Sequence, residues 1–259
     1  RRPTATFATL FAPVGSLKDK INTFFLKNKL VNISIPNLFK QPEIETIAQL
    51  KKYGFSPKMM ERFYKPFFSG IFLENDLKTS SNMFDFVMKM FSEGDAAIPE
   101  LGMEEIPKQL VAVLPENSIQ YNVKVSAIEN NKIIYEDGTT LDTDKIIIAT
   151  EAIGLASNYI SKTKQNFHQV TNVYFEANIA PTKKAVVVLN ASNNKKWANN
   201  LTVISNVSNQ YAPTGKVLIS ISYNGIPAID DATLAENMKT ELKQWYGNQV
   251  SAWKMLKTY

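Results

Sequence analysis

Cysteine is absent from the 259 residues of this sequence, and His168 is its single histidine. The lack of cysteine excludes a disulfide framework and thiol catalysis, and it fits a reducing compartment. One histidine excludes multi-histidine metal sites, so no metal centre is expected, and it leaves little material for triad chemistry. No apolar run approaches the ~18 residues of a membrane span. We therefore expect a cytoplasmic protein with no transmembrane span, and association with a membrane surface stays open.

The chain also lacks blocks of like charge. Its 29 Lys and Arg residues exceed its 24 Asp and Glu residues, which gives a net charge of +5, but the two signs are interspersed. No basic block of the kind that follows a phosphate backbone is present, so no nucleic-acid partner is expected. Arg1 and Arg2 do not indicate a twin-arginine export signal, because the apolar stretch behind them is short and is broken by Pro13.

Glycine is missing where a dinucleotide-binding turn would need it. The sequence has 10 glycines, and no two of them are separated by a single residue. The G-x-G-x-x-G turn lets the backbone approach a pyrophosphate at a helix N-terminus. That motif is therefore absent from this chain.

The most informative stretch that is present runs from Ser118 to Ala152. Alternation at period two predicts a half-buried strand through Ile119, Tyr121, Val123 and Val125. Asn130-Asn131 predicts a turn, and Asp137-Gly138 predicts a tight hairpin. The run from Lys145 to Ala149 is apolar without alternation, which indicates a strand covered on both faces. These features predict a β-meander that leads into a buried strand.

Helical and strand patterns occupy the rest of the chain. Helices are predicted from Ser16, Pro42 and Ser56, and over 81–91, 102–114 and 230–246. The first begins with a capping box of Ser16 and Asp19, and its apolar face consists of Leu17, Ile21, Phe24 and Phe25. The helix over 102–114 is expected to point Ile106, Leu110 and Leu114 inward.

Four strands are predicted after the meander, over 171–178, 185–190, 201–207 and 216–223. Their short, turn-rich connections favour antiparallel pairing. The predicted fold class is therefore α+β, a mainly antiparallel sheet with packed helices, and the meander lies to one side. A Phe-rich bend over 66–73 is the most apolar bend in the sequence.

The order of these motifs resembles the flavin amine oxidase and phytoene desaturase family, which includes protoporphyrinogen oxidase-like proteins. The meander leading to a strand that ends in Ala149-Thr150 is similar to one piece of the two-dinucleotide-binding flavoproteins. Further matching residues follow in order over most of the chain: Phe67–Leu73, Ser80-Ser81, Gly94, Ile98-Pro99, Gly102-Met103, Ile106-Pro107, Asn122–Val125 with Ile128, Tyr174-Phe175, Tyr211–Pro213, Gly215-Lys216 and Trp253. No single motif is specific, so the ordered set carries the resemblance.

The resemblance implies that this chain is the central portion of an FAD-dependent oxidoreductase. In the family the glycine-rich turn lies before the matched part and a second FAD-contacting segment lies after it, and this chain starts without Met. FAD is therefore expected in the intact protein but not to be retained by this portion alone. The implied FAD contacts are Val125, Ala149 and Thr150. The implied domains are a substrate-binding domain in two halves, 1–115 and 155–259, and a strip of the FAD-binding domain, 116–154.

The resemblance also implies the reaction of the intact protein, which is dehydrogenation or desaturation of an apolar small-molecule substrate with electrons passed to the flavin. Phe68, Phe72 and Tyr174 are the candidate substrate contacts, and core packing is the alternative for any single Phe. Amine oxidases of the superfamily often place a lysine on the strand comparable to Val170–Phe175, which has none. The desaturase-like branch is therefore favoured. No catalytic residue is assigned, and His168 is expected to be solvated.

A second hypothesis is a non-enzymatic module that binds an apolar ligand or a partner protein, because the Phe and Met content comes without a catalytic cluster. A purely structural scaffold also stays open. The apolar face of the meander has no obvious cover within the chain. We therefore expect Ile133, Ile146 and Ile148 to be partly uncovered, or to be covered by a neighbouring copy through self-association.

Overall fold

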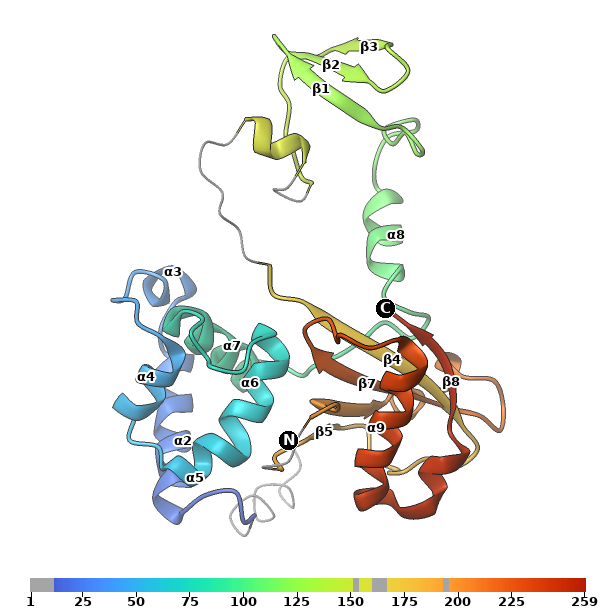
Figure 1. Cartoon of the computed structure of the whole chain (residues 1–259). Helices are drawn as coiled ribbons and strands as arrows, with labels where there is room; N and C mark the ends of the chain where they lie inside the picture. The colour runs from blue at the N-terminus through green and yellow to red at the C-terminus, as the bar shows by residue number, and fades with distance from the viewer. Residues whose placement is uncertain (1–11, 151–153, 160–166, 193–195) are drawn as a thin grey trace. The chain divides into compact units, whose positions relative to one another are not determined.

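The structure is a computed structural model that describes residues 12–150, 154–159, 167–192 and 196–259. It divides into two compact units, drawn with all their elements in Figure 1. The first unit combines the described residues up to Met103 with those from His168 to Tyr259, and the second runs from Glu104 to Phe167. Within the described ranges, no helix combines the length and the apolar character that crossing a membrane requires.

The first half of the first unit is helical. Its elements are α2 (Leu17–Val31), α3 (Ile35–Leu38), α4 (Thr46–Lys52), α5 (Pro57–Met59), a π-helical turn (Met60–Tyr64), α6 (Lys65–Phe72) and α7 (Ser81–Glu93). The capping box predicted at Ser16 and Asp19 is present, and the Ser56 side chain caps α5. The segment predicted as a Phe-rich bend is helical instead, because Pro66 falls in the first turn of α6, where proline is tolerated.

The helical part has its own core, which contains Leu26, Leu30, Leu50, Tyr64, Phe68 and Phe84 among others. The apolar face predicted for the first helix is not the face that packs into it. Leu26 and Leu30 of α2 are buried together with Asp19, while Leu17, Ile21, Phe24 and Phe25 are all exposed. Hydrogen bonds explain this difference. Asp19 accepts hydrogen bonds from Ser56 and therefore turns its own side of α2 toward α5.

The second half of the first unit is a five-stranded antiparallel sheet. Its strands are β4 (Val170–Ala177), β5 (Val187–Leu189), β6 (Asn200–Val203), β7 (Val217–Asn224) and β8 (Lys254–Thr258), in the order β5-β6-β7-β4-β8. Four of these strands match the predicted ones, and β8 was not predicted. Short 3-10 helices connect the strands at Ile204–Asn206, Asn209–Tyr211 and Gly247–Ala252.

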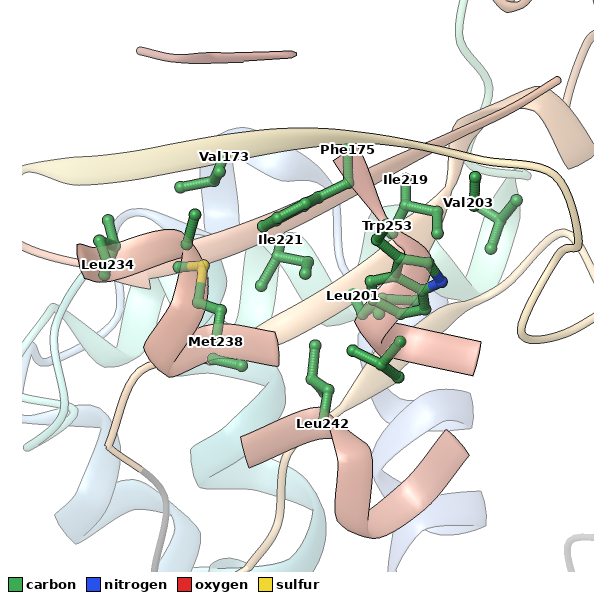
Figure 2. Packing of buried hydrophobic residues seen from close by; sticks show 14 residues of the cluster. Val173, Phe175, Leu201, Val203, Ile219, Ile221, Leu234, Met238, Leu242 and Trp253 are labelled. Atoms are coloured by element: carbon green, nitrogen blue, oxygen red, sulfur yellow. The ribbon is translucent and has the colours of Figure 1, made fainter. Parts of the chain in front are cut away.

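One face of this sheet is covered by α9 (Asp231–Tyr246), which lies where the sequence predicts a helix and is capped by the Asp230 side chain. Figure 2 shows the apolar side chains of the two layers in contact. The sheet contributes Val173, Phe175, Leu201, Val203, Ile219 and Ile221, and α9 contributes Leu234, Met238 and Leu242. Alternate residues of β4 are buried from Thr171 to Ala177, so the residues between them lie on the opposite face.

The second unit contains α8 (Glu105–Val111), a meander of β1 (Val125–Glu129), β2 (Lys132–Tyr135) and β3 (Thr140–Asp142), and a 3-10 turn at Leu155–Asn158. The turns predicted at Asn130-Asn131 and at Gly138 have the positive φ angles that those residue types tolerate. The half-buried strand predicted from Ile119 begins only at Val125.

Two further predictions for the second unit are wrong. The run from Lys145 to Ala149 is not a strand, because a strand buried on both faces needs neighbouring strands, and the described residues supply no ladder partner. In α8 no residue is buried, and Ile106, Leu110 and Leu114 are exposed. The expectation of a partly uncovered meander is confirmed, since Ile133, Ile146 and Ile148 are half-buried.

Candidate functional site

A hollow of about 520 Å³ in the second unit brings together three residues that the sequence marked separately. Val125, at the start of β1, lines it together with Ala149 and Thr150, which lie more than twenty residues further along the chain. The other lining side chains are mostly apolar and include Ile128 and Ile133. A flat, apolar group of a ligand therefore suits this hollow better than a charged one.

The edge strand of this hollow is held in place by one side chain. The hydroxyl of Tyr159 donates to the carbonyl of Ile128 and accepts from the backbone N–H of the same residue, both at 2.7 Å. The free backbone groups of β1 are thus satisfied next to the lining residues, as exposed strand edges require. The paired residues Ile128 and Ile133 place their side chains on the same side of the hairpin.

In the first unit, the sheet face opposite α9 is polar. Its central row crosses four strands through Thr202, Ser220, Tyr174 and Lys257, which are partners in the strand registers. Ser220 of this row donates a hydrogen bond of 3.0 Å to the side chain of Asn172. Asn172 and its partner Ser222 form the neighbouring row. Tyr174 is half-buried, and its ring meets that of Tyr259 edge to face at 5.8 Å. Tyr174 therefore lies on a surface that offers hydrogen-bonding groups.

Lys257 is a member of this row that the sequence did not reveal. Lys257 lies beside Tyr174 because β8 pairs with β4, although the two residues are more than eighty positions apart in the sequence. Its ammonium group lies 4.4 Å from the centroid of the Tyr259 ring, within cation–π range. The strand Val170–Phe175 has no lysine, and Lys257 lies on the neighbouring strand β8.

Phe68 and Phe72, the predicted substrate contacts in α6, lie in the helical core. Phe68 is fully buried, and its ring packs 4.7 Å from that of Phe84 and 5.3 Å from that of Phe72. The aromatic side chains that do reach the surface are their neighbours. Phe67 is half-buried, stacks on Phe63 at 5.7 Å and contacts the exposed Phe91.

A second hollow, of about 480 Å³, lies beside α6 within the first unit and is lined largely by polar groups. Ser69 of α6 donates a 3.0 Å hydrogen bond to Asn199, and Asn224 donates a 2.9 Å hydrogen bond to the carbonyl of Ser69. Gly70 permits this close approach, because a Cβ there would lie within about 3 Å of the amides of Asn199 and Asn200. Trp197 and Tyr223 stack on each other at the rim, at 6.1 Å.

Glu241 of α9 positions one wall of this polar hollow. Its carboxylate accepts hydrogen bonds from the backbone N–H of Trp197 at 2.8 Å and from the N–H of Ala198 at 3.4 Å. Its other oxygen accepts from the side chain of Asn190, a fully buried residue, at 2.6 Å. The loop that leads into β6 is therefore tied to α9 by one carboxylate.

One buried titratable group of the helical part is Asp85, whose partner is Tyr53. Burial raises the pKa of Asp85, and the hydrogen bonds from Tyr53 act against that shift. The Tyr53 hydroxyl donates to both carboxylate oxygens, at 2.9 and 3.1 Å, and accepts from Gln49 at 2.8 Å. Because every member has a partner, this network stabilises the packing of α4 on α7.

His168 is exposed, and its Nδ1 lies 2.6 Å from the carbonyl of Phe72, to which it donates. A nitrogen used in this way cannot act as a base at the same time. Over the described ranges of the chain, no group of three or more His, Asp or Glu side chains is arranged to hold a metal ion.

The comparison with protein families decides the assignment. The family model for flavin containing amine oxidoreductases matches residues 4–256, which is nearly the whole chain. This chain belongs to that family. Among curated proteins, no sequence matches the chain significantly.

Several solved structures share the fold of this chain at low sequence identity. An oxidoreductase from Methanosarcina mazei has a TM-score of 0.70 at 18% identity, over 98% of this chain and 62% of that chain. A triple mutant of putrescine oxidase has a TM-score of 0.66 at 9% identity, over 92% of this chain and 61% of that one. Reduced UDP-galactopyranose mutase has a TM-score of 0.54 at 12% identity, over 94% and 60%. This amine oxidoreductase chain thus spans about three fifths of the length of each of these structures.

Membership in a flavin-containing family assigns FAD to the intact protein. The residues of the second-unit hollow fit part of that cofactor, because a mostly apolar lining beside a hydrogen-bonded strand edge suits a flat aromatic ring. They do not supply the grip on the pyrophosphate, since the glycine-rich turn is absent from the sequence. Val125, Ala149 and Thr150, which the family resemblance marks as FAD contacts, are among the residues that line this hollow.

Replacing Glu241 with glutamine in this chain is expected to loosen the loop at Trp197 and Ala198. The amide nitrogen of glutamine would face an N–H donor on one side, and we expect a loss of about 1–2 kcal/mol in the free energy of unfolding. Hydrogen exchange should report faster exchange at the two backbone amides. Glu236→Gln is the matched control, because Glu236 lies on the same helix and only pairs with Lys239 at its surface. If the backbone amides of Trp197 and Ala198 exchanged equally fast in both variants, the role given to Glu241 would be contradicted.

Proposed function

We propose that this chain is the substrate-binding portion, with a strip of the FAD-binding domain, of an FAD-dependent oxidoreductase that dehydrogenates its substrate. The observation that carries the proposal is the second-unit hollow. Three positions that a family resemblance marks as FAD contacts, Val125, Ala149 and Thr150, line that one hollow, although Val125 lies more than twenty residues before the other two. The hollow thus places the residues marked by the resemblance at one site.

The division of labour follows from the residues present. FAD, when bound, accepts the electrons of the substrate, and the chain contributes binding and orientation. The hollow at Val125 and Ile128 would contact one edge of the cofactor. In the first unit, the polar sheet face around Tyr174 is a surface on which a substrate can be oriented by hydrogen bonds.

For the substrate itself, the first candidate is an apolar molecule that is dehydrogenated in a desaturase-like reaction. What supports it is the aromatic surface at α6, where Phe67 contacts both Phe63 and Phe91 and none of the three rings is fully buried. Burying an apolar ligand against such rings contributes about 25 cal/mol per Å². Phe68 and Phe72 would support this surface from below, as the packed layer behind it.

The second candidate is a polar substrate, and a separate observation favours it. The sheet face that carries Tyr174 offers hydroxyl and amide groups, and Lys257 adds a positive charge beside it. A surface of this kind would leave its polar groups unpaired against an apolar ligand. A substrate that contacts the aromatic surface at α6 is therefore apolar, and one that contacts the sheet face at Tyr174 is polar.

An FAD titration of the full-length gene product and of this chain is the test of the cofactor assignment. We expect binding, followed by flavin absorbance and fluorescence, in the full-length protein and not in this chain alone, because the pyrophosphate grip is missing here. Lack of flavin in both would overturn the oxidoreductase proposal. It would leave a non-enzymatic module for an apolar ligand or partner protein as the working hypothesis.

The same full-length preparation separates the two substrate classes. If the substrate is apolar, Phe67→Ser should slow anaerobic flavin reduction and Lys257→Met should not. If the substrate is polar, Lys257→Met should slow anaerobic flavin reduction and Phe67→Ser should not. Lys257 is exposed, whereas Phe67 is half-buried and packs against the helical core, so circular dichroism must first show that both variants are folded.

Two further expectations belong to the proposal. One is a cytoplasmic location, with contact at a membrane surface. The other is self-association through the half-buried apolar face of the meander, which Ile133, Ile146 and Ile148 share with the second-unit hollow. FAD-domain elements of the intact protein would compete for the same face.

A further inference from the structure

Helix α2 presents an apolar side to solvent. Leu17 is 64% exposed, Ile21 46%, Phe24 59% and Phe25 63%. The opposite side of the helix, with Leu26 and Leu30, is the one that packs into the helical core. A surface helix normally places polar residues toward water, so this arrangement needs another explanation.

The exposed apolar side chains gather on one side of the helix. At roughly 100° per residue, positions 17, 21, 24, 25 and 31 fall on that side, and the exposed Asn28 lies between Phe24 and Val31 on it. On the same side the rings of Phe24 and Phe25 meet edge to face at 5.9 Å. We call this set of side chains, Leu17, Ile21, Phe24, Phe25 and Val31, the α2 face.

Lysines border the α2 face on both sides. By the same helical geometry, Lys18 and Lys29 lie along one border, and Lys20 and Lys27 lie along the other. Within the described ranges, Lys18, Lys27 and Lys29 form no ion pair with an acidic residue.

Acidic charge is missing from this side of the helix. The one acidic residue of α2, Asp19, is buried and accepts hydrogen bonds from Ser16 and Ser56 inside the molecule. The outer side of α2 is therefore apolar at its centre and positive at both borders.

We propose that the α2 face binds an anionic lipid surface. Aromatic and aliphatic side chains flanked by lysines are the pattern of helices that lie in the membrane interface, where rings enter the acyl boundary and ammonium groups meet headgroup charges. A second copy of the chain is a poorer occupant, because it would bring lysine borders against lysine borders. The inference rests on the membrane contact included in the proposed function and names the surface that makes it. It does not depend on flavin binding, so the FAD titration and the vesicle experiment can fail independently.

Vesicle co-sedimentation of this chain tests the proposal. Phosphatidylcholine vesicles with about one-third phosphatidylglycerol should bind the chain, and pure phosphatidylcholine vesicles should bind it about tenfold more weakly. Phe24→Gln/Phe25→Gln should reduce binding to the anionic vesicles at least about tenfold, because the inserted apolar area is lost. Lys18→Gln/Lys27→Gln should reduce it about tenfold and should weaken its dependence on salt.

Ile179→Gln/Ile226→Gln is the matched control, since both isoleucines are about 70% exposed, at 70% and 69%, and lie outside α2. It should bind the vesicles like the unchanged chain, and circular dichroism should confirm that all variants are folded. Equal binding by Phe24→Gln/Phe25→Gln and by the control would overturn the proposal. So would a concentration-dependent dimer that only the α2 variants abolish, or a full-length protein that does not bind vesicles that this chain binds.

Discussion

Phe68→Ala is expected to destabilise the helical part of the first unit by about 3–5 kcal/mol. The side chain is fully buried, and its ring contacts those of Tyr64, Phe72 and Phe84 at 6.3, 5.3 and 4.7 Å. Truncation removes the transfer free energy of the ring and leaves a cavity among side chains that cannot collapse into it. Urea unfolding followed by circular dichroism measures the effect.

Two neighbouring substitutions sharpen this experiment. Phe68→Leu keeps most of the volume and should cost only about 1–1.5 kcal/mol. Phe67→Ala removes a half-buried ring of the same helix and should cost less than Phe68→Ala. If Phe68→Ala kept full stability and changed only ligand binding, Phe68 would be a wall of a binding cavity and not a core residue.

This experiment concerns a distinction that the sequence could not make. The segment from Phe67 to Phe72 is apolar on all sides of a helix, so periodicity does not say which ring faces the core. The structure turns Phe68 and Phe72 inward and leaves Phe67 half-buried. The orientation follows from the polar contacts of Ser69 with Asn199 and Asn224, which are far away in the sequence.

Local signals predicted those elements that local chemistry decides. Ser16 with Asp19, Ser56 before Pro57, and Asp230 all cap helices where the sequence places them. Four strands of the main sheet were predicted because strand-like segments there are joined by short, turn-rich connections. The prediction of the buried side of α2 was wrong. An apolar stripe predicts a buried side, but the hydrogen bonds of Asp19 determine which side of this helix is buried.

Elements that depend on distant partners were missed. β8 is short, carries lysines at its ends, and forms because β4 offers a free edge more than eighty residues earlier. Lys257 therefore entered the candidate site only with the structure. The run from Lys145 to Ala149 was predicted as a strand and is not one. Its apolar sequence predicts pairing with neighbouring strands, and the described residues do not include such partners.

Asp19→Asn is expected to lower the free energy of unfolding by about 2–4 kcal/mol at neutral pH. One carboxylate oxygen accepts from the N–H of Ser56, and the other accepts from the N–H of Ser16, each at 2.7 Å. The hydroxyls of Ser16 and Ser56 also donate to it, at 2.7 Å. An asparagine must point its own N–H groups at one of two backbone donors, which cannot turn away, and a buried donor is then left unpaired.

The dependence on pH distinguishes this carboxylate from a merely well-packed residue. Burial raises the pKa of Asp19, but the hydrogen bonds from Ser56 and Ser16 outweigh burial and lower that pKa from 3.8 to about 2. A lowered pKa contributes stability that is complete above about pH 4 and is lost as the pH falls toward 2, and the shift corresponds to about 2 kcal/mol. The gap in unfolding free energy between the unchanged chain and Asp19→Asn should therefore narrow over that range. Asp231→Asn, an exposed aspartate in the first turn of α9, should show no such narrowing, and a gap for Asp19→Asn that stays constant with pH would contradict the charged form as the source of stability.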